Sequence, residues 1–269
     1  MFSFRSIFLM LLFVPGLAFA SSTSCLEATL KAKPNLNEII KKTEIDIKDL
    51  KKTGEEYFND IYNRFESSTK KSLNSHNLGN YDQGLNFAAE SLVLHKFSEP
   101  WNHLPFLAIA SSRSGINLTK LGHLDVSLKC HSLAYQLLSE VVKENKQYES
   151  HLAWEAINIG NLYKKLGDNE EAFNFLKEAK SKFRTLSSKN TKKFTPSYLN
   201  ALAEESSLHL ENNEIAAAEL LMEEYFRMID ISDKSYPAYQ AFAREIFARI
   251  FIELNKLTEA KEQIKIAKD

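Results

Sequence analysis

The stretch Asn158–Lys180, NIGNLYKKLGDNEEAFNFLKEAK, decides the fold of this chain. Apolar residues recur at helical spacing over 159–166 and again over 172–179, on either side of Gly167. A glycine directly after the last periodic residue is the usual way to leave a helix through a left-handed residue, and Asp168 is a residue type that begins the next helix. The stretch therefore predicts two helices folded back on each other.

Small residues mark where these two helices touch. A glycine inside a helix costs roughly 1 kcal/mol relative to alanine, so Gly160 within the first helix needs a packing reason. Ala172 supplies a second small residue on the second helix. We expect the two backbones to approach each other closely at Gly160 and Ala172.

This spacing resembles a tetratricopeptide repeat, in which a small residue is followed by an aromatic residue, a glycine, an alanine, a bulky apolar residue and another small residue. Those positions hold Gly160, Tyr163, Gly167, Ala172, Leu176 and Ala179. The family's tryptophan position holds Ala156, and its closing proline is absent. The resemblance implies stacked antiparallel helix pairs that wind into a right-handed superhelix.

The same turn recurs along the chain. The five predicted turn residues, spaced by 43, 45, 45 and 43, are Gly79, Gly122, Gly167, Asn212 and Asn255. All are glycine or asparagine, the residue types that best tolerate the left-handed conformation. The residues predicted to pack the helix pairs are Gly115, Gly160, Ala172, Ala217, Ala248 and Ala260. The fourth repeat departs from this rule, because Glu205 stands where the others mostly have a small residue, and a register shift is one explanation.

The whole chain is predicted to be all-α. Only eight glycines and six prolines occur in 269 residues, which leaves little material for β-turns. We expect an α-solenoid of about five helix pairs over 54–269, preceded by a capping segment over 21–53. The predicted repeats are 54–97, 98–145, 146–189, 190–231 and 232–269. Their period exceeds the usual 34 or so residues, a style of repeat similar to kinesin light chains and Rap-type bacterial regulators.

Residues 1–20 have the pattern of a secretory signal peptide, with a positive charge at Arg5, an apolar run over Ile7–Val14 and a cleavage site after Ala20. A transmembrane anchor is the alternative, but it needs about 20 unbroken apolar residues. A lipoprotein is disfavoured because Ser22 stands three residues before Cys25. We expect export to the periplasm, or secretion, and no membrane span after cleavage.

Charge and cysteine content narrow the function. The chain has a formal charge of −1, which becomes −2 on loss of Arg5, and its lysines are interspersed with acidic residues, so nucleic acid is not an expected partner. In an oxidising compartment, Cys25 and Cys130 are candidates for a disulfide; the alternative is two unlinked cysteines. The seven histidines show no metal-binding spacing, and no nucleophile or phosphate motif is present. We expect no cofactor, no metal site and no enzymatic activity.

The resemblance implies a concave groove lined by the first helix of each pair. The groove residues that it implies are Lys120, Trp154, Ile157, Asn161, Lys164, Lys165, Leu199, Leu202, His209 and Arg249. Such a surface suits a peptide whose apolar side chains pack on Trp154 and Leu202 while an acidic group meets Lys120, Lys164 or Lys165. For Trp154 the alternative is a core position between repeats.

We therefore predict an exported adaptor or scaffold that binds another protein or peptide. One alternative is a peptide-sensing regulator whose array changes curvature on binding, and a more remote one is an envelope or wall-processing enzyme. The oligomeric state stays open. At the C-terminal end of the array, lysines and glutamates of 258–268 either form a polar outer face or pack on a partner.

Overall fold

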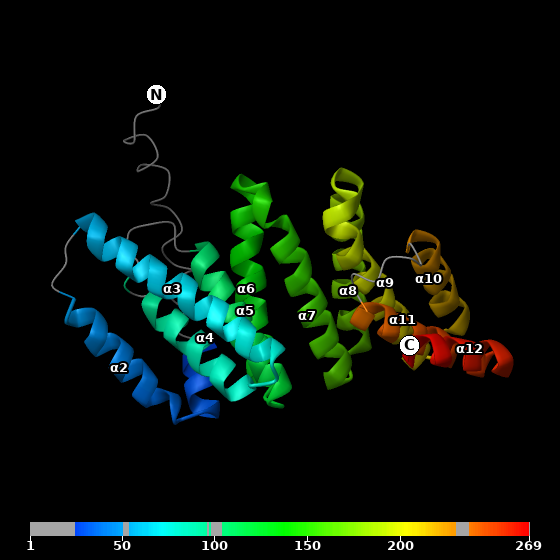
Figure 1. The fold of residues 1–269 in the computed structure, drawn as a ribbon, viewed down its shortest axis with the longest axis horizontal. Helices are drawn as coiled ribbons and strands as arrows, with labels where there is room; N and C mark the ends of the chain where they lie inside the picture. Colours follow the sequence, from blue (N-terminus) through cyan, green and yellow to red (C-terminus); the bar gives the residue numbers. More distant parts are fainter. Residues whose placement is uncertain (1–24, 51–53, 96, 98–103, 230–236, 269) are drawn as a thin grey trace. The chain divides into compact units, whose positions relative to one another are not determined.

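The computed structural model describes residues 25–50, 54–95, 97, 104–229 and 237–268. Within these ranges the α-helices pack in adjacent pairs and no strand occurs, so the predicted all-α class is confirmed (Figure 1). The predicted signal peptide, residues 1–20, lies outside the described residues. None of the described helices has the length and apolar character needed to cross a bilayer.

The helices form two compact units, residues 1–148 and 149–269. The first unit contains a helical segment over 25–32 and then α2 (Leu36–Lys48), α3 (Gly54–Asn77), α4 (Tyr81–His95), α5 (Leu104–Lys120), α6 (Leu124–Glu144) and the 3-10 turn η1 (Lys146–Tyr148). The second unit contains α7 (Glu149–Leu166), α8 (Asn169–Lys189), α9 (Thr191–Glu211), α10 (Ile215–Met228), α11 (Pro237–Glu253) and α12 (Leu257–Lys268).

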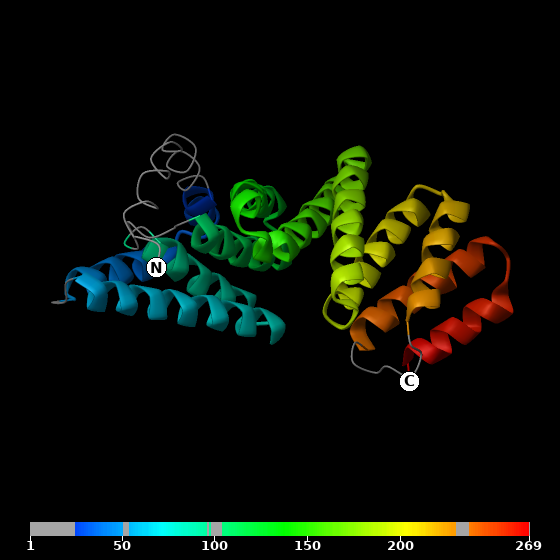
Figure 2. The same cartoon turned by 90° about the horizontal axis from the view of Figure 1, so that it is seen from above.

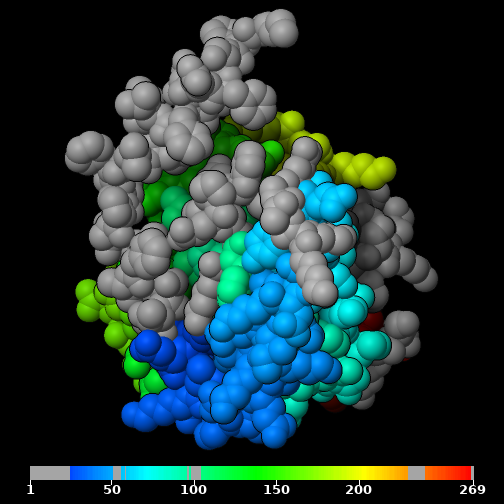
Figure 3. All heavy atoms as spheres, turned by 90° about the vertical axis from the view of Figure 1, so that its left-hand side faces the viewer, coloured from blue at the N-terminus to red at the C-terminus, as the bar shows by residue number. Residues whose placement is uncertain are grey.

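In the first unit, α3 pairs with α4 and α5 pairs with α6, while α4 packs against α5 and α3 also touches α5. The segment predicted as one cap is two helices, 25–32 and α2, separated around Pro34. Helix α2 packs on α4. Figure 3 shows α2 and α3, in blue and light blue, at the surface of one face.

In the second unit, the pairs are α7 with α8, α9 with α10, and α11 with α12 (Figure 2). Helix α9 is the central element, because it contacts α7, α8, α10 and α11. As a result its residues from Tyr198 to Leu208 are buried, except Glu204.

All five turns have the same construction. The residues with positive φ are Gly79, Gly122, Gly167, Asn213 and Asn255. In each turn the next amide donates to the carbonyl five residues earlier, as Asp168 does to Tyr163 (3.0 Å), which is a Schellman motif. The prediction that Asn212 is the fourth turn residue is wrong, because its φ is −88°. The turn falls one residue later, at Asn213, whose φ is 60°.

The small-residue contacts follow the same register. In each pair the two small residues lie twelve positions apart: Ser72 and Gly84, Gly115 and Ser127, Gly160 and Ala172, Ser206 and Ala218, Ala248 and Ala260. In three pairs a serine hydroxyl crosses to the partner's carbonyl, at distances of 2.7 to 2.9 Å. The fourth pair therefore packs through Ser206 and Ala218. The prediction that Ala217 packs this helix pair is wrong, since Ala217 is only half-buried while Ala218 is fully buried.

Two glycines permit this close approach. A Cβ added at Gly115 would lie 2.5 Å from Nε2 of His131, and one added at Gly160 would lie 2.8 Å from Cγ of Leu176. Both positions lie inside helices, so their conformational cost is offset by packing that a larger residue would prevent.

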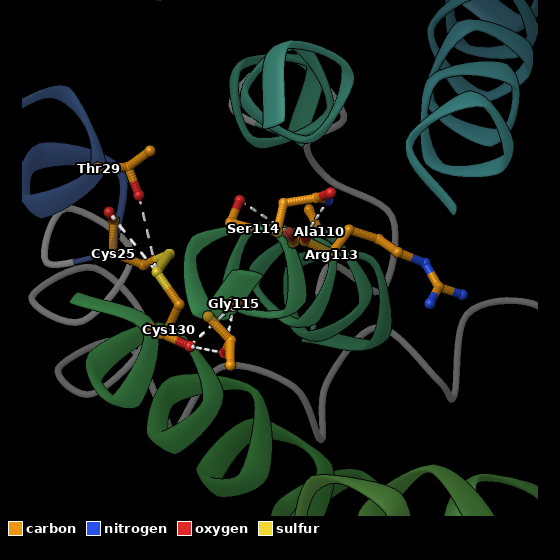
Figure 4. Close-up of a disulfide and its surroundings, with 10 residues drawn as sticks. Cys25, Thr29, Ala110, Arg113, Ser114, Gly115 and Cys130 are labelled. Carbon is orange, nitrogen blue, oxygen red and sulfur yellow. Dashed lines mark hydrogen bonds between the residues drawn. A yellow bond between two sulfur atoms is a disulfide. The ribbon is translucent and has the colours of Figure 1, made fainter. Parts of the chain in front are cut away.

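A disulfide joins Cys25 to Cys130, and both cysteines are fully buried. Figure 4 shows it linking the N-terminal helical segment to α6, with Thr29 directed toward Cys130. The Thr29 hydroxyl lies 3.7 Å from the sulfur of Cys130. The bridge closes a loop across 105 positions of sequence and holds the segment 25–32 against the first unit.

Candidate functional site

The predicted groove residues on α7 divide into buried and accessible ones. Ile157 is 2% exposed, so its prediction as a partner-binding residue is wrong. Trp154 is half-buried and meets Phe183 of α8 edge-on, with ring centroids 5.5 Å apart. Trp154 therefore contributes to packing within its own helix pair while part of its surface stays accessible.

The predicted groove residues on α9 are wrong. Leu199 and Leu202 are buried, and His209 turns toward α8, where its ring lies 4.6 Å from that of Phe173. The reason is the turn at Asn213, because a one-residue shift rotates a helical side chain by about 100°. The residues of α9 that face Lys164 of α7 include Ser207, which is buried, and Glu211, which is exposed.

Lys164 links α7 to this side of α9. Its ammonium lies 3.4 Å from Oγ of Ser207 and 3.7 Å from carboxylate oxygens of both Glu204 and Glu211. Two carboxylates share one ammonium, so this surface is locally negative. Oδ1 of Asn161, one turn earlier on α7, is buried without a hydrogen-bond partner among the described residues. Lys164 is therefore already paired with carboxylates and is poorly suited to receive an acidic group of a partner.

Three other predicted groove residues are exposed. Lys165 lies at the end of α7, Arg249 on α11, and Lys120 at the end of α5 in the first unit. Of these, Lys120 has the most distinctive surroundings, because Lys120 and Arg113 both lie close enough to His76 to act electrostatically on its imidazole.

A polar cluster lies where α3 and α5 meet, close enough to Lys120 for its charge to act on His76. Asn117 is fully buried, and its Nδ2 donates to the carbonyl oxygen of Arg113 (2.8 Å) and to Oγ of Ser72 (3.3 Å). Because the amide nitrogen is used in this way, Oδ1 accepts, and Nδ1 of His76 donates to it at 3.3 Å. Asn117 therefore fixes the imidazole of His76 between the two helices.

The charge state of His76 follows from this position. Burial lowers the pKa of His76 below its usual value, the hydrogen bond that His76 donates to Asn117 opposes this, and the positive charges of Lys120 and Arg113 lower the pKa further. The ring is consequently neutral at pH 7, with the proton on Nδ1. The basic site, defined as His76, Arg113 and Lys120, thus carries two cations and one imidazole that an anion would help to protonate.

Sequence reasoning found Lys120 but missed Arg113, Asn117 and His76. Arg113, Asn117 and Lys120 follow i, i+4, i+7 spacing and so lie on one face of α5, which is a signal that the sequence does contain. His76 carries no comparable signal, because only the packing of α3 on α5 brings it to Asn117, 41 positions away.

Within the described residues, no group of three or more histidine, cysteine, aspartate or glutamate side chains is placed to hold a metal ion. Two tyrosines with raised pKa values are packing residues. Burial raises the pKa of Tyr225 to about 12. Burial also raises the pKa of Tyr198, whose hydroxyl donates to Glu224 at 2.6 Å. The arrangement of the basic site suits noncovalent recognition of an anionic group.

No family model matches the sequence, and no curated protein matches it. Solved structures do. TPR-like repeats of a Podosopora anserina kinesin light chain are 12% identical, with a TM-score of 0.57, covering 76% of this chain and 93% of that one. BtubC (BKLC) from P. vanneervenii is 14% identical, with a TM-score of 0.55 and coverage of 77% and 89%. The apo form of RapI is 16% identical, with a TM-score of 0.53 and coverage of 88% and 92%. The fold is TPR-like.

Proposed function

We propose that this chain is an exported adaptor that binds a segment of another protein or a peptide, and that the basic site receives an acidic group of that segment. The observation that carries the proposal is the pair of cations, Arg113 and Lys120, beside a neutral His76 that Asn117 holds in place. The TPR-like fold supports it as well, because stacked helix pairs provide extended surfaces for such binding. The mechanism is reversible binding.

The chemistry of the site favours a carboxylate. Arg113 contributes a positive charge beside His76, and Lys120 adds a mobile charge at the exposed end of α5. A bound carboxylate would also raise the pKa of His76 and favour its protonated ring, which could then donate a charged hydrogen bond to the ligand. An aspartate or glutamate side chain and a C-terminal carboxylate both meet these requirements.

Export is part of the proposal. The signal-peptide pattern of residues 1–20 motivates it, and the Cys25–Cys130 disulfide supports it, since stable disulfides are typical of oxidising compartments. We propose the periplasm as the compartment, with secretion as the alternative. Detection of the mature N-terminus at Ser21 by mass spectrometry of the native protein tests it, and a retained leader would contradict it.

A peptide array tests the binding proposal. The mature protein is applied to immobilised random peptides, and the bound sequences are compared between the parent and Lys120→Glu. We expect the parent to enrich acidic peptides, and its affinity for them to fall as the salt concentration rises. Lys120→Glu should bind the same peptides with an affinity lower by at least about tenfold, which corresponds to about 1.4 kcal/mol.

The matched control is Lys129→Glu, which makes the same charge change at an exposed position on α6, the other helix of the pair. It should leave the enriched peptides unchanged. Equal binding by both variants, or enrichment of peptides without acidic residues, would refute the role of the basic site.

The second candidate is a peptide-sensing regulator. It is favoured by the TPR-like repeat construction, since the curvature of a stacked array follows from small rotations between neighbouring repeats that a bound peptide would change. Small-angle scattering with and without a peptide selected on the array distinguishes the two functions. An adaptor keeps its radius of gyration, and a regulator of this kind becomes more compact.

A further inference from the structure

The second helices of the second unit differ at one equivalent position. Nine residues after the turn residue, α8 has Leu176, α10 has Met222 and α12 has Ile264. Leu176 and Met222 are fully buried, but Ile264 is 41% exposed. Leu257, seven residues before Ile264 and so on the same side of α12, is 54% exposed.

Helix α8 shows what normally covers this position. Leu176 and Ala172 form one core cluster with Leu208, which belongs to α9, the first helix of the next pair. An ion pair accompanies this contact, because Nζ of Lys180 on α8 donates to Glu205 of α9 at 2.9 Å. The covering helix therefore presents an acidic residue and, three residues later, a bulky apolar one.

Helix α12 repeats the receiving residues of α8. The matching residues, α8 first, are Glu171 and Glu259, Ala172 and Ala260, Leu176 and Ile264, Lys177 and Lys265, Ala179 and Ala267, and Lys180 and Lys268. In α8, Ala172, Leu176 and Lys180 of this set contact α9. In α12 the equivalent apolar residue faces outward, with exposed Lys261 and Lys265 beside it.

We propose that this face of α12 is a docking site for one amphipathic helix of a partner protein, which packs on α12 as α9 packs on α8. The partner helix has the same pattern as α9, with an acidic residue three positions before a leucine or isoleucine. A second copy of the chain is a poorer occupant, because pairing two such faces would bring Lys261 and Lys265 against the same lysines. The site is independent of the basic site on the first unit.

A synthetic peptide of residues 191–211, labelled with fluorescein, is the probe, since α9 already makes this contact within the chain. Its fluorescence anisotropy is titrated with the mature protein. We expect saturable binding that falls at least tenfold for Ile264→Glu, and also falls for a peptide carrying Glu205→Lys. Ile266→Glu is the matched control: Ile266 is similarly exposed, at 40%, and stands where α8 has Glu178, so binding should not change.

Circular dichroism tests whether both protein variants are folded. Because Ile264 is exposed, we expect Ile264→Glu to keep the helical fold. Absence of saturable binding to the parent, or equal binding by Ile264→Glu, overturns the proposal. Sedimentation of the unbound parent as a dimer that Ile264→Glu dissociates also overturns it, because a second copy would then cover the face. Lys120→Glu should bind the probe normally, so failure here is distinct from failure of the basic site.

Discussion

Oγ of Ser206 donates a 2.9 Å hydrogen bond to the carbonyl oxygen of Ala218, which fixes the crossing point of α9 and α10. Both residues are fully buried. Ala218→Leu should therefore force the helices apart and lower the free energy of unfolding by about 1–3 kcal/mol or more. Thermal denaturation followed by circular dichroism measures the change.

The matched control is Ala217→Leu, one position earlier and half-buried. It should change stability by no more than about 0.5 kcal/mol, as substitutions away from the core usually do. A larger loss for Ala217→Leu than for Ala218→Leu would show that the helix pair packs in the other register.

The turn at Asn213 gives a second prediction. Its φ of 60° is a left-handed conformation that costs an ordinary L-residue about 1–2 kcal/mol. Asn213→Gly should preserve or raise the free energy of unfolding, whereas Asn213→Ala should lower it by about 1 kcal/mol. Urea denaturation of the two variants gives both values.

Asn212→Gly serves as the comparison for this turn. It removes the amide that accepts from Asn169 at 2.6 Å and donates to Leu208 at 3.1 Å, so it should destabilise the protein. If Asn212→Gly were the stabilising substitution, the turn would have been assigned to the wrong asparagine.

The period and the helix pairs were predictable because the turn residues and small residues recur locally in the sequence. The fourth repeat was misplaced by one residue because Asn212 and Asn213 are both acceptable turn residues. The twelve-residue separation between small residues would have decided the matter, since Ser206 and Ala218 obey it with small side chains and Glu205 with Ala217 does not.

The candidate site was less predictable than the fold. Lys120 was found because its position in the repeat implies exposure, but the partner of a groove residue depends on which helices meet. Lys164 is paired by carboxylates of α9, and His76 reaches Asn117 only through the packing of α3 on α5. Such contacts join residues forty or more positions apart, and helical periodicity carries no information about them.

The disulfide gives a third prediction. Replacing Cys25 and Cys130 by serine should lower the free energy of unfolding by about 4 kcal/mol, because a long loop is no longer closed in the unfolded chain. Hydrogen exchange followed by mass spectrometry should show faster exchange over 25–32 and in α6. Peptides from α9 and α10 should be unchanged, since they belong to the other unit. Unchanged exchange in 25–32 would mean that packing alone holds this segment.

The lowered pKa of His76 gives the last prediction. Because the folded protein holds this ring neutral, the unfolded chain binds more protons below about pH 6.5, and acidification favours unfolding. The contribution is fully present above that pH and is lost as the pH falls toward the folded-state pKa. His76→Gln should therefore show a smaller decrease in melting temperature between pH 7.5 and pH 5 than the parent. An equal pH dependence in the parent and His76→Gln would mean that His76 is as easily protonated in the folded protein as in the unfolded chain.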